Sequence, residues 1–182
     1  MRDETRFFVA LLPSLAVQEY AEQVIQELGD RYQTSTSKSP PHVTLQPPFQ
    51  WQLQRVAQLE QVLSEFAGQW PRVSVQLSGF GAFVPRVLYI NVLKTAELLA
   101  LQAALATALE EALGIVDPKS KSRTFSPHLT VASRNLTRQS FRQAWTELQA
   151  RQVEFEFVGD RLTLLIHDGQ CWQVQSEFAL CQ

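Results

Sequence analysis

The feature that most constrains the fold is an internal repeat in the order of the predicted elements. Two short phrases, "PPHVTL" at 40–45 and "SPHLTV" at 126–131, each read as the start of a strand and are each followed by a helical segment. An alternating strand that ends in glycine then follows in both halves, "VSVQLSG" at 73–79 and "VEFEFVG" at 153–159. Because each unit can bury its apolar face only against another layer, the repeat predicts two similar lobes related by a pseudo-twofold axis.

Apolar periodicity and chain-breaking residues place the individual elements. Helices are predicted from Pro13-Ser14 to Gly29, at about 53–66, at about 96–113 with Gly114 as the C-cap, and at about 138–150. Strands are predicted at 6–12, 42–46, 73–80, 87–92, 128–133, 153–157, 161–168 and 171–178, with Asp168-Gly169 as a hairpin turn. No linker-like stretch divides the chain. We therefore expect one α+β domain over residues 1–182, in which two mainly antiparallel sheets face a central cleft and the helices lie outside.

Each of the two phrases puts a histidine and a threonine on the same face of its strand. Side chains at i and i+2 project together, so His42 accompanies Thr44 and His128 accompanies Thr130, while the residues between them point into the apolar layer. Each histidine could simply begin a strand and bind backbone groups. The chain has only three histidines, however, and two of them share this setting, which favours one site built from both lobes.

Two imidazoles and two hydroxyls suit an in-line displacement at a phosphodiester. The ordinary pKa of imidazole is about 6.5, so one neutral histidine can act as general base while a protonated one acts as general acid. Threonine hydroxyls can hydrogen-bond to the phosphoryl oxygens as their charge changes.

The distribution of charge supports an anionic substrate. All 18 Asp and Glu residues lie outside 31–59 and 118–146, the windows around the two phrases, although the net charge is −2 and argues against a broadly basic nucleic-acid coat. Arg134 would lie on the His/Thr face if strand alternation continued without interruption. Arg123 and Lys38, in the loops before the two strands, fit substrate contact and plain surface about equally. Phe125 could stack on a base, with core packing as the alternative.

Metal and cofactor sites are not predicted. Zinc or iron usually takes three or four protein ligands, often including a carboxylate. The windows around the two phrases contain no Asp or Glu. His167 precedes the Asp168-Gly169 turn and is expected to be an exposed hairpin residue. A glycine-rich phosphate-binding loop is also missing from the sequence.

Cysteine usage and hydropathy favour a cytoplasmic protein. Cys171 and Cys181 are ten residues apart without a CxxC motif, so we expect two buried thiols in a reducing compartment. No apolar run approaches the roughly 20 residues that span a bilayer. We expect a monomer that does not associate with membranes.

The paired motifs resemble those of the 2H phosphoesterase superfamily, which includes the bacterial RNA 2′,3′-cyclic phosphodiesterases, also called 2′-5′ RNA ligases. The opening strand "RFFVALLP" and the second motif, written "FSPHLTVAS", are similar as well. The resemblance implies a bilobal α+β fold, a metal-free central cleft, and hydrolysis of a cyclic phosphate at an RNA or nucleotide end. It also implies that His42 and His128 are the acid/base pair and that Thr44 and Thr130 bind phosphate oxygens.

Two departures from the superfamily pattern bear on the substrate. RNA-directed members often have arginine five residues after the second histidine, where this chain has Ser133 followed by Arg134. After the first motif, "QPPFQW" replaces the more usual Arg-Phe-hydrophobic-Gly sequence. Two alternatives therefore stay open: a module that binds RNA ends or small phosphorylated ligands without turnover, and the reverse reaction, 2′-5′ ligation.

Overall fold

Two antiparallel sheets of four strands each form the frame of the computed structural model, which describes residues 4–119 and 122–182. One sheet has the strand order β2-β1-β7-β8 and the other β5-β4-β3-β6. The strands are β1 (Glu4–Leu11), β2 (Val43–Gln52), β3 (Val73–Phe83), β4 (Val87–Val92), β5 (His128–Ala132), β6 (Glu154–Gly159), β7 (Arg161–His167) and β8 (Trp172–Ala179). The predicted α+β class with two antiparallel sheets is confirmed.

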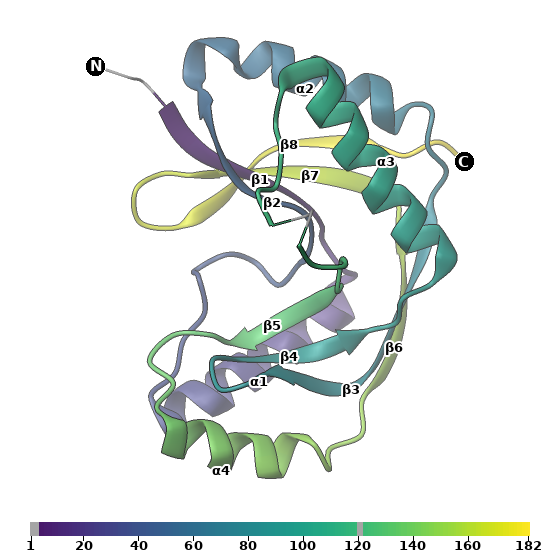
Figure 1. The fold of residues 1–182 in the computed structure, drawn as a ribbon. Helices are drawn as coiled ribbons and strands as arrows, with labels where there is room; N and C mark the ends of the chain where they lie inside the picture. The colour runs from purple at the N-terminus through teal and green to yellow at the C-terminus, as the bar shows by residue number, and fades with distance from the viewer. Residues whose placement is uncertain (1–3, 120–121) are drawn as a thin grey trace.

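Four α-helices cover the outer sides of the two sheets, as predicted (Figure 1). They are α1 (Leu15–Tyr32), α2 (Val56–Ala67), α3 (Ala96–Leu113) and α4 (Arg138–Leu148), with a short 3₁₀ turn, Leu53–Arg55, before α2. Helix α1 contacts β5 and α4, helix α2 contacts β7 and β8, and helix α3 contacts β2 and β3. In Figure 1 the two sheets form the arms of a C-shaped outline, with β2 and β5 on its inner side.

The two glycine-ended repeat segments pair with each other rather than lying in separate sheets. Val73 lies opposite Gly159, and the N–H of Gly79 donates to the carbonyl of Val153 at 2.8 Å. The first valine of each segment thus lies beside the glycine of the other segment. Two identical segments in an antiparallel pair are related by a local twofold axis in this way. Beyond this shared pair, β3 continues along β4, and β6 continues through Asp160 into β7 of the other sheet.

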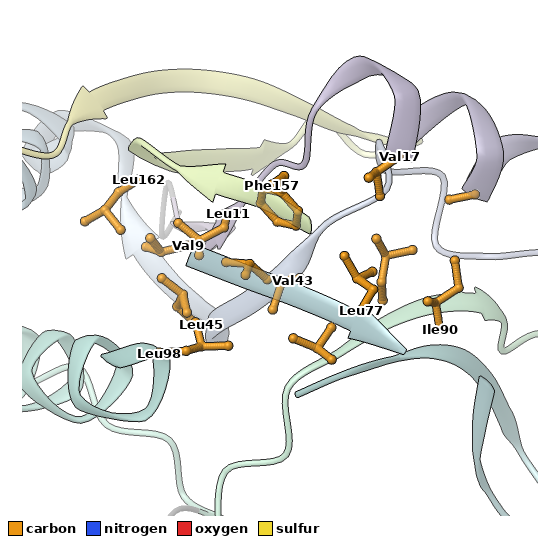
Figure 2. Close-up of a cluster of buried hydrophobic side chains, with 14 of the residues drawn as sticks. Val9, Leu11, Val17, Val43, Leu45, Leu77, Ile90, Leu98, Phe157 and Leu162 are labelled. Atoms are coloured by element: carbon orange, nitrogen blue, oxygen red, sulfur yellow. The ribbon is translucent and has the colours of Figure 1, made fainter. Parts of the chain in front are cut away.

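One connected hydrophobic core joins the two sheets. Leu11 and Leu45 of the first sheet and Leu77 and Ile90 of the second are all buried in the same cluster (Figure 2). Phe157 of β6 belongs to this cluster as well. A smaller cluster, made of Phe8, Ala10, Leu165 and Trp172, lies apart from this core.

Several element boundaries differ from the sequence prediction, and two of the differences have a clear physical reason. Helix α1 continues past Gly29 to Tyr32, where Arg31 and Tyr32 bind Glu147 of α4 at 2.6 Å each. The helix then ends at Gln33, which takes a left-handed φ of 57°. Strand β2 runs to Gln52 instead of ending near residue 46, because an edge strand tolerates the missing N–H groups of Pro47 and Pro48.

The environments of Cys171, Cys181 and His167 also differ from expectation. The two cysteines are free and half-buried rather than fully buried. His167 is half-buried rather than exposed, because it ends β7 with its ring 4.9 Å from that of Trp172. Within the described ranges, no helix is long and apolar enough to cross a membrane.

Candidate active site

The paired motifs lie on the edge strands of the two sheets, and these edges contact each other. His42 directly precedes β2, which carries Thr44, and β5 carries both His128 and Thr130. These four side chains are half-buried, whereas the residues that alternate with them are fully buried: Val43, Leu45, Leu129 and Val131. The local alternation therefore turns each His/Thr pair away from the core.

Both strands change register directly after the threonine. In β2, Thr44 lies opposite Ala10 but Gln46 lies opposite Val9, which leaves Leu45 as an extra residue. In β5, Thr130 lies opposite Tyr89 but Ala132 lies opposite Leu88, which leaves Val131 as an extra residue. The two bulges are as far apart as the two histidines (131 − 45 = 128 − 42 = 86), so they belong to the repeat. Such bulges often re-aim side chains beside active sites.

The bulge at Val131 overturns the reason for placing Arg134 on the His/Thr face. Alternation is interrupted there, and β5 ends at Ala132. The N–H of Arg134 instead donates to the carbonyl of Ser35 at 2.9 Å, and its side chain is exposed. Uninterrupted alternation as far as Arg134 was therefore a wrong prediction.

The two imidazoles are oriented in the same way. Nδ1 of His42 lies 2.8 Å from the carbonyl oxygen of Pro40, and Nδ1 of His128 lies 2.7 Å from that of Ser126. Because a carbonyl oxygen only accepts, each Nδ1 is the donor, and Nε2 of the neutral ring is left as a proton acceptor. The intervening Pro41 and Pro127 have a fixed φ, which favours this return of the ring to the backbone.

Both histidines have pKa values below the ordinary 6.5, chiefly because burial disfavours the protonated ring. The hydrogen bonds to Pro40 and Ser126 oppose this shift. The positive charge of protonated His128 lowers the pKa of His42 further, and that of Arg123 lowers the pKa of His128. The two rings are thus close enough to affect each other's protonation, and both are neutral in the free protein at pH 7.

A pocket of about 500 Å³ opens beside this pair. Thr44, His128, Arg123 and Phe125, all predicted as site residues, line it. Lys38 and Arg134 are not among its lining residues. Lys38 is exposed, and its carbonyl accepts from the N–H of Trp172 at 3.0 Å, which anchors the loop before His42. His42 and Thr130 are also not among the lining residues, although each is two residues away in the chain from one that is, Thr44 and His128.

Two pocket residues have no signal in the sequence. Phe83 comes from the end of β3, and its ring meets that of His128 edge-on with centroids 5.0 Å apart. Gln102 comes from α3, and its Nε2 donates to the carbonyl of the bulged Leu45 at 3.3 Å. Both are distant in sequence from the motifs, and only the approach of α3 and β3 to the edge strands brings them in.

The sequence matches the model of a known family. Residues 13–170 match the family described as the 2′-5′ RNA ligase superfamily. The chain belongs to this superfamily. Among relatives, proteins named "Putative phosphoesterase" from Geobacillus sp. (strain WCH70) and Bacillus pumilus (strain SAFR-032) share 27% identity over 176 residues and 28% over 179 residues. These alignments cover 95% and 96% of this chain and 95% and 97% of the relatives.

Solved structures of other proteins share the fold. TT0787 of Thermus thermophilus superposes with a TM-score of 0.70 at 18% identity, covering 96% of this chain and 97% of that one. Escherichia coli LigT in its apo form gives a TM-score of 0.66 at 17% identity, covering 98% and 99%. LigT has also been crystallised with 3′-AMP and with phosphate. The family description and the names of the curated relatives thus both refer to chemistry at phosphate esters.

The depressed histidine pKa values predict a pH-dependent stability. Between pH 7.5 and the folded-state pKa values the two histidines bind more protons in the unfolded chain than in the folded one. The free energy of unfolding therefore falls as the pH drops through 6.5 and levels off below the folded-state pKa values. Urea unfolding between pH 7.5 and 5.5 measures this slope. The double variant His42→Gln/His128→Gln should show a clearly smaller slope. An unchanged slope would contradict the pKa assignment.

Proposed function

We propose that this protein is a metal-independent phosphodiesterase that hydrolyses a 2′,3′-cyclic phosphate at an RNA or nucleotide end. The observation that carries the proposal is the equivalent orientation of His42 and His128 at contacting sheet edges, each with Nδ1 bound to a carbonyl and Nε2 free for proton transfer. The pocket beside them offers room for one nucleoside. Asp117 is the carboxylate that lines the pocket. Metal independence is proposed because no group of three or more His, Cys, Asp or Glu side chains among the described residues could hold a metal ion.

The reaction needs one proton shared by the two histidines. The neutral imidazole removes a proton from water, the oxygen of that water forms a bond to phosphorus, and the bond from phosphorus to one ribose oxygen breaks. The protonated imidazole gives its proton to that ribose oxygen. Hydroxyls of Thr44 and Thr130 donate to the non-bridging oxygens. Because a bound phosphate anion favours the protonated form of a nearby imidazole, substrate binding raises the pKa of one ring and supplies the acid.

Arg123 is the cation that we assign to phosphate binding. It lines the pocket, and its charge lowers the pKa of His128. RNA-directed members of the superfamily often have arginine five residues after the second histidine, but this chain has Ser133 at that position. Phe83 and Phe125 supply apolar walls on which a base can stack. Lys38 and Arg134 stay candidates for contacts with a longer RNA beyond the pocket.

Arg123→Ala is expected to lower kcat/KM for a 2′,3′-cyclic nucleotide by about tenfold, the lower end for one hydrogen bond to a charged group. The matched control is Arg134→Ala, an exposed arginine on the other side of β5 that is not among the pocket-lining residues, and it should change kcat/KM by less than about twofold. Steady-state kinetics on both variants measures the difference. An equal loss in the two would show that only general surface charge matters.

The activity itself is tested with 2′,3′-cyclic AMP and with a short RNA that ends in a cyclic phosphate, in EDTA and H₂¹⁸O. We expect a linear 2′- or 3′-phosphate that carries one ¹⁸O, detected by mass spectrometry. Turnover that disappears with EDTA and returns with added metal would contradict metal independence. A complete lack of product from both substrates would contradict the proposed reaction.

A binding module without turnover is the second candidate. The departures at Ser133 and in "QPPFQW" favour it, because binding needs the pocket but not a matched acid/base pair. Tight binding of a cyclic nucleotide without product formation would select it. Ligation would use the same site with an RNA hydroxyl in place of water: its oxygen would form the bond to phosphorus while the bond from phosphorus to one ribose oxygen breaks.

The location and oligomeric state are part of the same proposal. Free thiols at Cys171 and Cys181 favour a reducing compartment, for which we propose the cytoplasm. Both histidines, both threonines and the pocket come from one chain, so a monomer is sufficient for activity.

A further inference from the structure

Tyr89 lies flat against the neighbouring strand because residue 81 is glycine. The two residues are paired across β3 and β4. A Cβ added to Gly81 would lie 2.3 Å from Cε2, 2.5 Å from Cζ and 2.7 Å from the hydroxyl oxygen of Tyr89, distances that real Cβ atoms essentially never show. Any other amino acid at position 81 would therefore displace the ring. Gly81 is needed here for space and not for an unusual backbone conformation.

The same ring packs against one of the two histidines. Tyr89 lies directly across the strand pair from Thr130, and the centroid of its ring is 5.2 Å from that of His128. Its centroid is also 4.6 Å from that of Phe83, which in turn meets His128 edge-on. Two aromatic rings thus limit the tilt of the imidazole, while the carbonyl of Ser126 fixes Nδ1.

The other lobe has no equivalent of this tyrosine. The residue opposite Thr44 is Ala10, and His42 packs instead on Phe8 with ring centroids 4.8 Å apart. Phe8 is supported by the edge of Trp172 at 4.6 Å. The repeat thus supplies the two motifs, but each lobe supports its histidine with different side chains.

We propose that Tyr89 is a positioning residue for His128 and that Gly81 provides the space in which its ring lies. The ring acts by packing. The phenol has no hydrogen-bond partner in the part of the chain that the structure describes. Burial raises the pKa of Tyr89, so the phenol is neutral near pH 7. Arg123 from the preceding loop lowers the pKa of His128, and His128 in turn lowers the pKa of His42, which directly precedes β2.

The test compares Gly81→Ala, Tyr89→Leu, the double variant and Tyr89→Phe, with 2′,3′-cyclic AMP as the substrate. Gly81→Ala and Tyr89→Leu should each lower kcat by about tenfold with a smaller change in KM, since a small misplacement of a catalytic group can cost up to about a hundredfold. The double variant should be no worse than Tyr89→Leu alone, because leucine removes the ring that the added methyl group would strike. Tyr89→Phe should keep nearly full activity.

Two outcomes would overturn this proposal. Multiplicative losses in the double variant would show that Gly81 does not act through Tyr89, and an equal loss in Tyr89→Phe would show that the hydroxyl matters more than the ring. If Gly81→Ala fails to fold, the comparison of Tyr89→Leu with Tyr89→Phe still decides between ring and hydroxyl.

Because the kinetic readout rests on the proposed phosphodiesterase activity, a second readout is independent of it. NMR titration of the free protein should show the pKa of His128 rising toward 6.5 in Gly81→Ala and Tyr89→Leu, as water reaches the ring, while the pKa of His42 stays nearly unchanged. An unchanged His128 titration in both variants would contradict the positioning role even if the wild-type protein proved inactive on every phosphate tested.

Discussion

His42→Ala and His128→Ala are each expected to lower kcat for a 2′,3′-cyclic nucleotide by about 10²- to 10⁴-fold, the range that general acid or base catalysis contributes. Each variant loses one proton-transfer group while Thr44, Arg123 and Phe125 of the pocket lining are unchanged. The double variant should be only slightly slower than the worse single one, because the two rings act in one step and their effects are not additive. Steady-state rates in EDTA measure all three.

The pH dependence of the same variants shows which histidine is the general acid and which is the general base. The wild-type kcat/KM profile should be bell-shaped, since one imidazole must be neutral and the other protonated. Loss of the base removes the limb that rises from acid pH, and loss of the acid removes the limb that falls toward alkaline pH. The limb that each variant retains therefore shows which histidine is the base.

His167→Ala is the matched control for these substitutions. His167 is the third histidine of the chain and ends β7, outside the lining of the pocket beside His128. Its replacement should leave kcat within about twofold of wild type. A loss comparable to that of His42→Ala would mean that the fold, rather than acid/base catalysis, explains the inactive variants, and the proposed mechanism would fail.

Leu77→Ala is expected to lower the free energy of unfolding by about 2–5 kcal/mol, the usual cost of truncating a fully buried leucine. Leu77 is completely buried in the core shared by both sheets, and β3 pairs with both β4 and β6. We propose that residues 1–182 fold as one unit for this reason. Urea unfolding of the variant should therefore remain a single transition by circular dichroism and tryptophan fluorescence.

Val158→Ala provides the comparison on the same strand pair. Val158 lies on β6 with 59% of its surface exposed, so its truncation should change the free energy of unfolding by less than about 0.5 kcal/mol. Two separate transitions in Leu77→Ala, one for each sheet, would show that the lobes are independent domains.

Local chemistry explains which elements the sequence predicts well. The bounds of α3 agree with the predicted 96–113, because the side chain of Thr95 caps its first turn and Gly114 takes a left-handed φ of 68° at its end. Gly29 does not end α1 in the same way. The helix continues past it to Tyr32, where its last turn binds Glu147. The end of a helix is thus predictable when the conformation of a local residue ends it. It is not predictable when a contact with a distant segment prolongs the helix.

Strand alternation is a property of consecutive residues, so the shared strand face of His42 and Thr44, and likewise of His128 and Thr130, is predictable from each motif alone. The prolines before the histidines likewise act locally on the carbonyls that hold Nδ1. Tertiary structure alone decided that the glycine-ended strands pair with each other, that alternation stops at Leu45 and Val131, and that Tyr89 lies over Gly81. Register and packing depend on partner strands far away in the chain, and no pattern within one segment encodes them.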